Sequence, residues 1–199
     1  MSYHIYTTDG IVLKRQNFGE SNSLFFILTA DLGLIAAMAQ AVRSHRSKLN
    51  SALQEYSLVS VSCVKGKNGW KVTNAISKES FFFGAPLSAQ KLVSQISAVL
   101  VRMMPGEQKH REVFSVVANG FSELKNVLTK GNFEILMMLR ILYHLGYVEK
   151  NSQTENFLQS ADNVDNETAD WSEKILKEVA SSKLELVRLI NKGLEESQL

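Results

Sequence analysis

The sequence of 199 residues contains one cysteine, Cys63, and two prolines. A single cysteine excludes a disulfide within the chain and a cysteine-rich zinc site. No apolar run approaches the roughly 18 consecutive residues that a membrane-spanning helix requires. The N-terminus also lacks the basic segment followed by an apolar one that marks a signal peptide. We therefore expect a soluble, cytoplasmic protein that needs no metal or other cofactor.

Motifs of the common catalytic sites are absent as well. The chain has no G-x-x-x-x-G-K-[ST], G-x-G-x-x-G, G-x-S-x-G or H-E-x-x-H sequence. Its histidines are scattered, and none has a carboxylate or a second histidine at the spacing of metal ligands: His4, His45, His110 and His144. These absences predict a protein that is not an enzyme.

Charge is unevenly distributed along the chain, although the net charge is only +2. Residues 1–80 carry nine Lys or Arg against five Asp or Glu, whereas residues 151–199 carry five against ten. The stretch 40–78 is strongly basic, with seven cations and a single acid, Glu55. A basic front half favours a polyanion as the partner on that side.

Residues 1–80 have the β-branched residues and the alternation that are typical of strands. Gly10 predicts a bulge or a close backbone approach, and Gly33 predicts a turn with a positive φ. Five evenly spaced strands favour a small closed or partly open barrel, and an oligonucleotide-binding (OB) barrel has this strand count. The predicted strands are 6–18, 24–29, 34–40, 54–65 and 70–76.

Helical spacing replaces alternation from about residue 81. Ser88 is expected to cap a helix that reaches Met104, and further helices are expected at 107–128 and 133–145. The helix at 133–145 is apolar nearly all round, so it should lie at the centre of a helical bundle.

The remainder of the chain completes this bundle. Residues 151–168 are polar and acidic without a period, which predicts an exposed loop or linker. Apolar stripes at helical spacing resume at Trp171 and again at Leu186. The predicted fold class is α+β, with an OB-fold DNA-binding domain at 1–80 followed by a helical domain at 81–199.

A basic loop between two predicted strands is the leading candidate for a binding site. The segment Val42–Leu49 contains Arg43, Arg46 and Lys48 without any acid, and a short helix fits within it. Arg, Lys, Ser and backbone N–H groups are the usual partners of phosphates; a solvated turn is the alternative interpretation. Further cations near strand ends extend the candidate DNA-binding set: Lys14, Arg15, Lys65, Lys67 and Lys71.

Aromatic residues in the same region are candidates for base stacking, which contributes about 1–3 kcal/mol per base. Trp70 and Tyr6 are the candidates that we retain. Phe18 and Tyr56 are expected in the barrel core instead.

Two ordered sets of short stretches resemble a known protein family. The first set is Thr8-Asp9-Gly10-Ile11-Val12-Leu13-Lys14, Phe18-Gly19-Glu20-Ser21, Thr29-Ala30-Asp31-Leu32-Gly33, Ala39-Gln40-Ala41-Val42-Arg43, Ser47-Lys48-Leu49 and Ala52-Leu53-Gln54. It resembles the N-terminal domain of the bacterial recombination mediator family RecO. A second set, Phe133-Glu134-Ile135-Leu136 through Leu145-Gly146-Tyr147, resembles a helix of the helical domain in that family.

The resemblance implies an OB barrel followed by a helical bundle. It implies binding of single- and double-stranded DNA, annealing of complementary strands, and loading of a recombinase during DNA repair in the bacterial nucleoid. The implied partners are the mediator RecR and the acidic C-terminal tail of single-strand-binding protein. Two other functions stay open from the residues themselves: a protein-interaction adaptor with a structural barrel, and an RNA-binding OB protein.

The sequence also departs from the family pattern. Many members carry a four-cysteine zinc site after the Leu-Gly-Tyr segment, whereas Val148–Gln153 contains no cysteine, so we expect no zinc. Asn22-Ser23 stands where Asp-Arg is frequent, which removes one positive charge. Lys130-Gly131-Asn132 has few of the basic residues that often precede the Phe-Glu helix. Binding of the acidic tail is therefore the implied property with least support from the residues.

Overall fold

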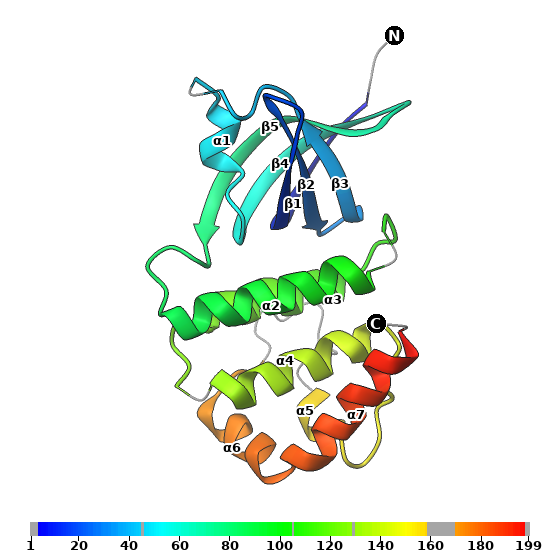
Figure 1. The fold of residues 1–199 in the computed structure, drawn as a ribbon. Helices are drawn as coiled ribbons and strands as arrows, with labels where there is room; N and C mark the ends of the chain where they lie inside the picture. Colours follow the sequence, from blue (N-terminus) through cyan, green and yellow to red (C-terminus); the bar gives the residue numbers. More distant parts are fainter. Residues whose placement is uncertain (1–3, 45, 105, 129, 159–169, 198–199) are drawn as a thin grey trace. The chain divides into compact units, whose positions relative to one another are not determined.

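The computed structural model describes residues 4–44, 46–104, 106–128, 130–158 and 170–197. Strands fill the first part of the chain and helices the second, which confirms the α+β class (Figure 1). The contacts divide the chain into two units. The first consists of residues 1–85 and 93–111, and the second of residues 86–92 and 112–199.

The strands of the first unit form a closed barrel in the order β1-β2-β3-β5-β4. Neighbouring strands are antiparallel except β3 and β5, which pair in parallel at Ala37–Trp70 and Met38–Lys71. A five-stranded barrel with a short helix between β3 and β4 is an OB fold, as predicted. The elements are β1 (Ile5–Phe18), β2 (Asn22–Thr29), β3 (Gly33–Ala39), α1 (Lys48–Ala52), β4 (Ser57–Gly66) and β5 (Gly69–Ser80).

The barrel core follows from alternation along the strands. On β4, Val59, Val61 and Cys63 are buried while the residues between them are partly exposed. Phe25 and Ile27 on β2 join the same core. Burial of this apolar set supplies the main driving force for closing the barrel.

Strand β1 is shared between two parts of the barrel. Residues Ile5–Ile11 pair with β4, and Gly10–Phe18 pair with β2. The register shifts between Val12 and Lys14, so the bulge lies at this point and not at Gly10. A Cβ atom at Gly10 would lie 2.6 Å from Ile27 Cγ2, so Gly10 serves the predicted close approach.

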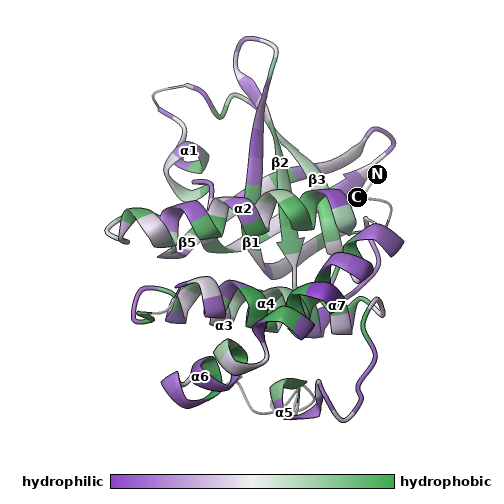
Figure 2. Cartoon of the chain, turned by 60° about the horizontal axis from the view of Figure 1, so that its bottom comes forward, coloured by the Kyte–Doolittle hydropathy of each residue, from purple (hydrophilic) through white to green (hydrophobic). Residues whose placement is uncertain are grey.

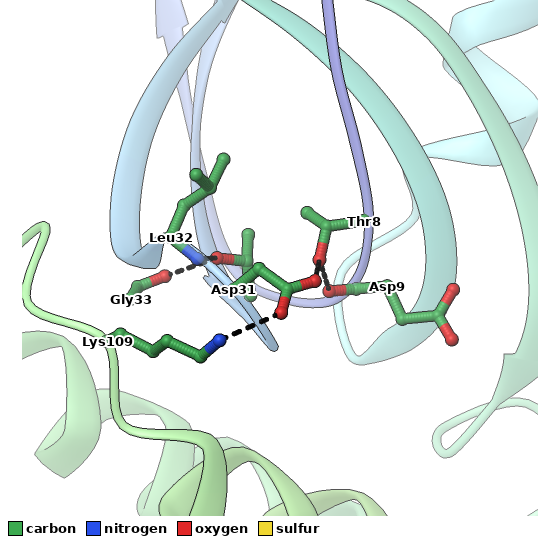
Figure 3. Close-up of polar contacts among 7 residues, drawn as sticks. Thr8, Asp9, Asp31, Leu32, Gly33 and Lys109 are labelled. Atoms are coloured by element: carbon green, nitrogen blue, oxygen red, sulfur yellow. Dashed lines mark hydrogen bonds and ion pairs between the residues drawn. The ribbon is translucent and has the colours of Figure 1, made fainter.

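Residues Gly106–Lys109, which we call the strap, follow α2 (Leu87–Met103) and lie against the barrel. Leu34 N donates a hydrogen bond to Gly106 O at 2.9 Å. Lys109 Nζ lies 3.2 Å from Asp31 Oδ1, and the Thr8 hydroxyl donates to Asp31 Oδ2 at 2.9 Å (Figure 3). These two donors lower the pKa of Asp31, the Thr8 hydrogen bond first.

The second unit is built around α4 (Lys130–His144), as the sequence predicted. Residues Phe133 and Ile135–Leu142 are buried, and α4 is hydrophobic over most of its length (Figure 2). The helices α5 (Glu155–Leu158), α6 (Glu173–Ser181) and α7 (Lys183–Glu196) all contact it. On α3 (Arg111–Glu123), Gly120 lets Met137 of α4 approach closely.

Several predicted boundaries differ from the structure. Helix α2 begins at Leu87, so Ser88 is not its cap. Helix α3 begins at Arg111 rather than residue 107, because the strap precedes it. The predicted boundary after residue 80 stays a prediction, although residues 93–111 group with the barrel by their contacts.

The acidic segment predicted at 151–168 is described only up to residue 158. Phe157 and Leu158 are buried on α5, so this part differs from the expected exposed loop. The buried Arg140 guanidinium donates from Nε to Phe157 O at 3.0 Å and lies over the Trp171 ring. Residues 159–168 lie outside the described part. Among the described residues, no helix is both long and apolar enough to cross a membrane.

Candidate nucleic-acid interface

The β1–β2 turn and the basic loop meet at one end of the barrel (Figure 1). Arg43 N donates to Ser21 O at 3.0 Å, and Arg43 Nη1 donates to Gly19 O at 3.1 Å. The Arg43 side chain remains exposed. The backbone contact fixes where the loop leaves β3, and the guanidinium keeps further N–H groups for a phosphate.

Arg46 and Lys48 are also exposed, and Lys48 is the first residue of α1. The structure thus brings Arg43, Arg46 and Lys48 into one loop-and-helix segment beside the β1–β2 turn. Their role in binding phosphate stays a prediction.

A second basic surface lies on the outer face of β1, β2 and β3. The register aligns Lys14, Phe26 and Ala36 in one row. The next row contains Gln16, Leu24, Met38 and Lys71. We call these seven residues the β2–β3 face. Because their neighbours along each strand point into the core, these side chains point outward.

Phe26 is the residue on this face that sequence reasoning missed. It is half-buried, and Lys14 Nζ lies 6.0 Å from its ring centroid. Leu24 to Leu28 are all apolar, so the side-chain pattern does not show which face of β2 is buried. Only the register shows that Phe26 lies beside Lys14, with Lys71 in the next row on β5. In OB folds, this face of strands 2 and 3 binds oligonucleotides.

Arg15 differs from the other predicted cations because its polar atoms are engaged within the barrel. Nε donates to Ser23 Oγ at 3.2 Å and Nη1 to Asn50 Oδ1 at 3.1 Å. The guanidinium carbon lies 5.4 Å from the Phe25 ring centroid, and the backbone N donates to Glu55 Oε1. This geometry gives Arg15 a role in closing the barrel end over α1.

The remaining predicted cations lie at the β4–β5 hairpin. Lys67 is exposed in the turn between Gly66 and Gly69. Lys65 Nζ lies 2.5 Å from Glu107 Oε2 of the strap and 5.4 Å from the Trp70 ring centroid. Lys65 is therefore already paired with an anion in this structure.

The aromatic residues predicted to stack on bases or to lie in the core differ in their exposure. Trp70 is only 6% exposed, which leaves little ring surface for a base, whereas Tyr6 is 37% exposed and meets Trp70 edge-on. Phe18 was expected in the core but is 61% exposed, because β1 continues past the barrel wall to the β1–β2 turn. Tyr56 is partly buried and stacks on Phe82.

Residues 1–81, which contain the whole barrel, match the family "Recombination protein O N terminal". The proteins named DNA repair protein RecO from Dehalococcoides mccartyi strain 195 and Heliobacterium modesticaldum are 27% and 28% identical to this chain. The matches cover 62% and 72% of this chain, and 49% and 52% of the relatives.

The barrel of this chain is thus similar to the N-terminal domain of RecO proteins. A further RecO relative, from Rubrobacter xylanophilus, is 32% identical over 77 residues, or 39% of this chain and 31% of that protein. The chain spans about half the length of the RecO proteins from Dehalococcoides and Heliobacterium that it matches. The family match therefore supports the barrel assignment most directly, because it covers the barrel in full.

Proposed function

We propose that this protein is a DNA repair and recombination mediator that binds single- and double-stranded DNA, anneals complementary strands and helps to load a recombinase onto DNA coated with single-strand-binding protein. Similarity to RecO proteins supports the general role. The finer steps rest on the surface of the barrel.

The observation that carries the proposal is the presence of two groups of exposed cations on the barrel unit. Arg43, Arg46 and Lys48 form one group, and the β2–β3 face adds Lys14 and Lys71 around Phe26. Such a surface can track a phosphate backbone with its cations and stack a base on its aromatic ring. Phosphate contacts carry no sequence information, so we expect the cations to bind without sequence preference.

Annealing follows from the same electrostatics. Two complementary strands repel each other through their phosphates. Cations that neutralise phosphates on both strands lower this repulsion, and base pairing then joins the strands. The protein takes no chemical part in this step; it raises the local concentration of two strands whose bases stay free to pair.

Salt dependence tests the proposed surface. Removing Arg43, Arg46 and Lys48 together should weaken binding to a fluorescent oligo-dT and reduce the log–log salt slope by up to about 2–3 units. The matched control removes three exposed cations of the helical unit, Lys174, Lys177 and Lys183. An unchanged slope in the first variant would place the DNA elsewhere.

Annealing assays with and without single-strand-binding protein test the wider role. We expect the chain to speed annealing of naked complementary strands, and an interaction with the acidic tail to preserve this activity on coated strands. Association with a RecR-like mediator is measured separately by sedimentation. A protein that binds no DNA at micromolar concentration would favour the adaptor function, and preference for RNA in a competition assay would favour an RNA-binding role.

A further inference from the structure

The strap places an acid on the β4–β5 hairpin. Glu107 of the strap and Lys65 of β4 are 42 residues apart in sequence, yet their side-chain charges lie 2.5 Å apart. Both side chains remain about half exposed, at 47% and 53%, so a dissolved polyanion can reach them. The pair is therefore accessible to exchange.

Trp70 supplies a second group at the same place. Its indole N–H is buried, and it has no hydrogen-bond partner of good geometry within the described part of the chain. Lys65 first, and to a smaller extent Trp70, stabilise the Glu107 carboxylate and lower its pKa, while burial acts in the opposite direction. An ammonium group and an indole N–H thus face one carboxylate, and both are donors that a phosphate oxygen also accepts.

Four contacts hold the strap that carries Glu107. The backbone bond from Leu34 N to Gly106 O and the Lys109–Asp31 ion pair secure its two ends. Between them, Gln108 O lies 2.2 Å from where a Cβ atom on Gly33 would be, so the strap packs directly on the backbone of the β2–β3 turn. The fourth contact is the exposed Lys65–Glu107 pair, which a competing anion reaches without opening the barrel.

We propose that Glu107 occupies, in the free protein, a phosphate position at the β4–β5 hairpin, so that single-stranded DNA reaches Lys65 and Trp70 by displacing this carboxylate. The proposal rests on the proposed function and extends it to regulation of the same surface. Glu107 acts as an internal competitor for phosphate and lowers the affinity of the hairpin for any weak polyanion. A long DNA strand that is also bound at Arg43 and the β2–β3 face can still displace Glu107.

The proposal makes a specific statement about salt. When a phosphate replaces Glu107 on Lys65, one ion pair is exchanged for another, and Lys65 contributes little to counterion release. Removal of the carboxylate frees Lys65 to release its own counterion. The salt slope for single-stranded DNA should then become steeper by about 0.7, the value for one phosphate.

The test is a double-mutant cycle in the full chain, with fluorescent oligo-dT as the probe. Glu107→Gln should raise affinity about two- to five-fold, the size expected for loss of one exposed ion pair, and should steepen the slope. In the otherwise unchanged chain, Lys65→Ala should leave the salt slope nearly the same. In the Glu107→Gln protein, the same substitution should reduce the salt slope by about 0.7. Glu178→Gln, at an exposed residue of α6, controls for the change in net charge.

Trp70 gives an independent readout. With Trp171→Phe, Trp70 is the only tryptophan left, because the chain has two. Saturating oligo-dT should change its emission, since a phosphate then replaces the Glu107 carboxylate beside the indole N–H. Unchanged emission with DNA bound would overturn the proposal.

Two other results would also overturn it. One is equal affinity and slope for Glu107→Gln and Glu178→Gln. The other is a change in affinity and salt slope on Glu107→Gln that is just as large in the Lys65→Ala background. Failure of the proposed function has a different signature, in which neither the unchanged chain nor any variant binds oligo-dT, and that result removes both ideas together.

Discussion

At the scale of single residues, Asp31 shows how a short polar contact joins distant parts of the barrel unit. It accepts a hydrogen bond from Thr8 on β1 and pairs with Lys109 of the strap. Both partners favour the ionised carboxylate, so the pKa of Asp31 in the folded protein lies below its ordinary value of 3.8. The stability that these contacts add is therefore present above the ordinary pKa and is lost as pH falls through the lowered one.

Asp31→Asn should lower the free energy of unfolding by about 0.2–1 kcal/mol at pH 7, as is typical of exposed pairs. The difference from the unchanged chain should shrink as the pH is lowered below 3.8. Urea unfolding at a series of pH values measures it. Glu178→Gln serves as the control for removal of one exposed acid. A constant difference between Asp31→Asn and the unchanged chain down to pH 2 would contradict the assignment.

The predicted cations illustrate what a sequence shows of single residues. Their positions near the ends of predicted strands could be read from the sequence. Their partners were not, because Glu107 lies 42 residues from Lys65, and Asn50 lies 35 residues from Arg15. Such pairings are set by the closed barrel, so composition alone could not separate an exposed Lys67 from an engaged Arg15.

At the scale of elements, the β2–β3 turn depends on one glycine. Gly33 has φ +74°, and a Cβ atom there would also lie 2.8 Å from Gly106 O of the strap. An alanine therefore meets backbone strain and a backbone clash together.

Gly33→Ala should lower the free energy of unfolding by about 1–3 kcal/mol, the usual cost of a left-handed conformation in a residue other than glycine. Gly19→Ala is a suitable control, because Gly19 also has a positive φ but has nothing within 4 Å of its Cβ position. Denaturant unfolding of the two variants measures the difference in their free energy of unfolding. A smaller loss for Gly33→Ala than for Gly19→Ala would show that the strap does not press on this turn.

Strands were predicted correctly where apolar and polar side chains alternate, and the predicted strands ended where this alternation ends. The prediction for β5 ended at Ile76, because Ser77–Ser80 are mostly polar, yet the strand continues to Ser80. Its last residues pair with Ser57–Val59 of β4, and those backbone hydrogen bonds leave no mark on side-chain pattern. Phe26 was not predicted as a surface residue for a related reason. It lies in an apolar run without alternation, so the register between strands is needed to assign the face on which it lies.

At the scale of the whole molecule, the first unit is longer than its barrel. Residues 93–111 belong to it by their contacts, and the strap adds the hydrogen bond from Leu34 to Gly106. The family match over residues 1–81 ends before these residues. A fragment cut at the end of the family match would therefore lack part of the unit.

A fragment of residues 1–111 should accordingly be more stable than one of residues 1–85, by at least about 1 kcal/mol, the size of one such hydrogen bond. Trp70 is the sole tryptophan in both fragments, so its fluorescence during urea unfolding reports each directly. Leu34→Pro in the longer fragment removes the donor as a control. Equal midpoints for the two fragments would contradict the division into units.

The shared strand β1 has a consequence for the order of events during synthesis. Ile5 pairs with Val64, so the first half of β1 waits for 59 further residues before its partner exists. At about 5–20 residues per second, the ribosome needs roughly 3–12 s for that length. Throughout this interval the nascent chain carries an unpaired strand edge, the kind of surface that chaperones and neighbouring chains recognise. The barrel closes later still, because β5, the last strand to be made, must pair with both β3 and β4.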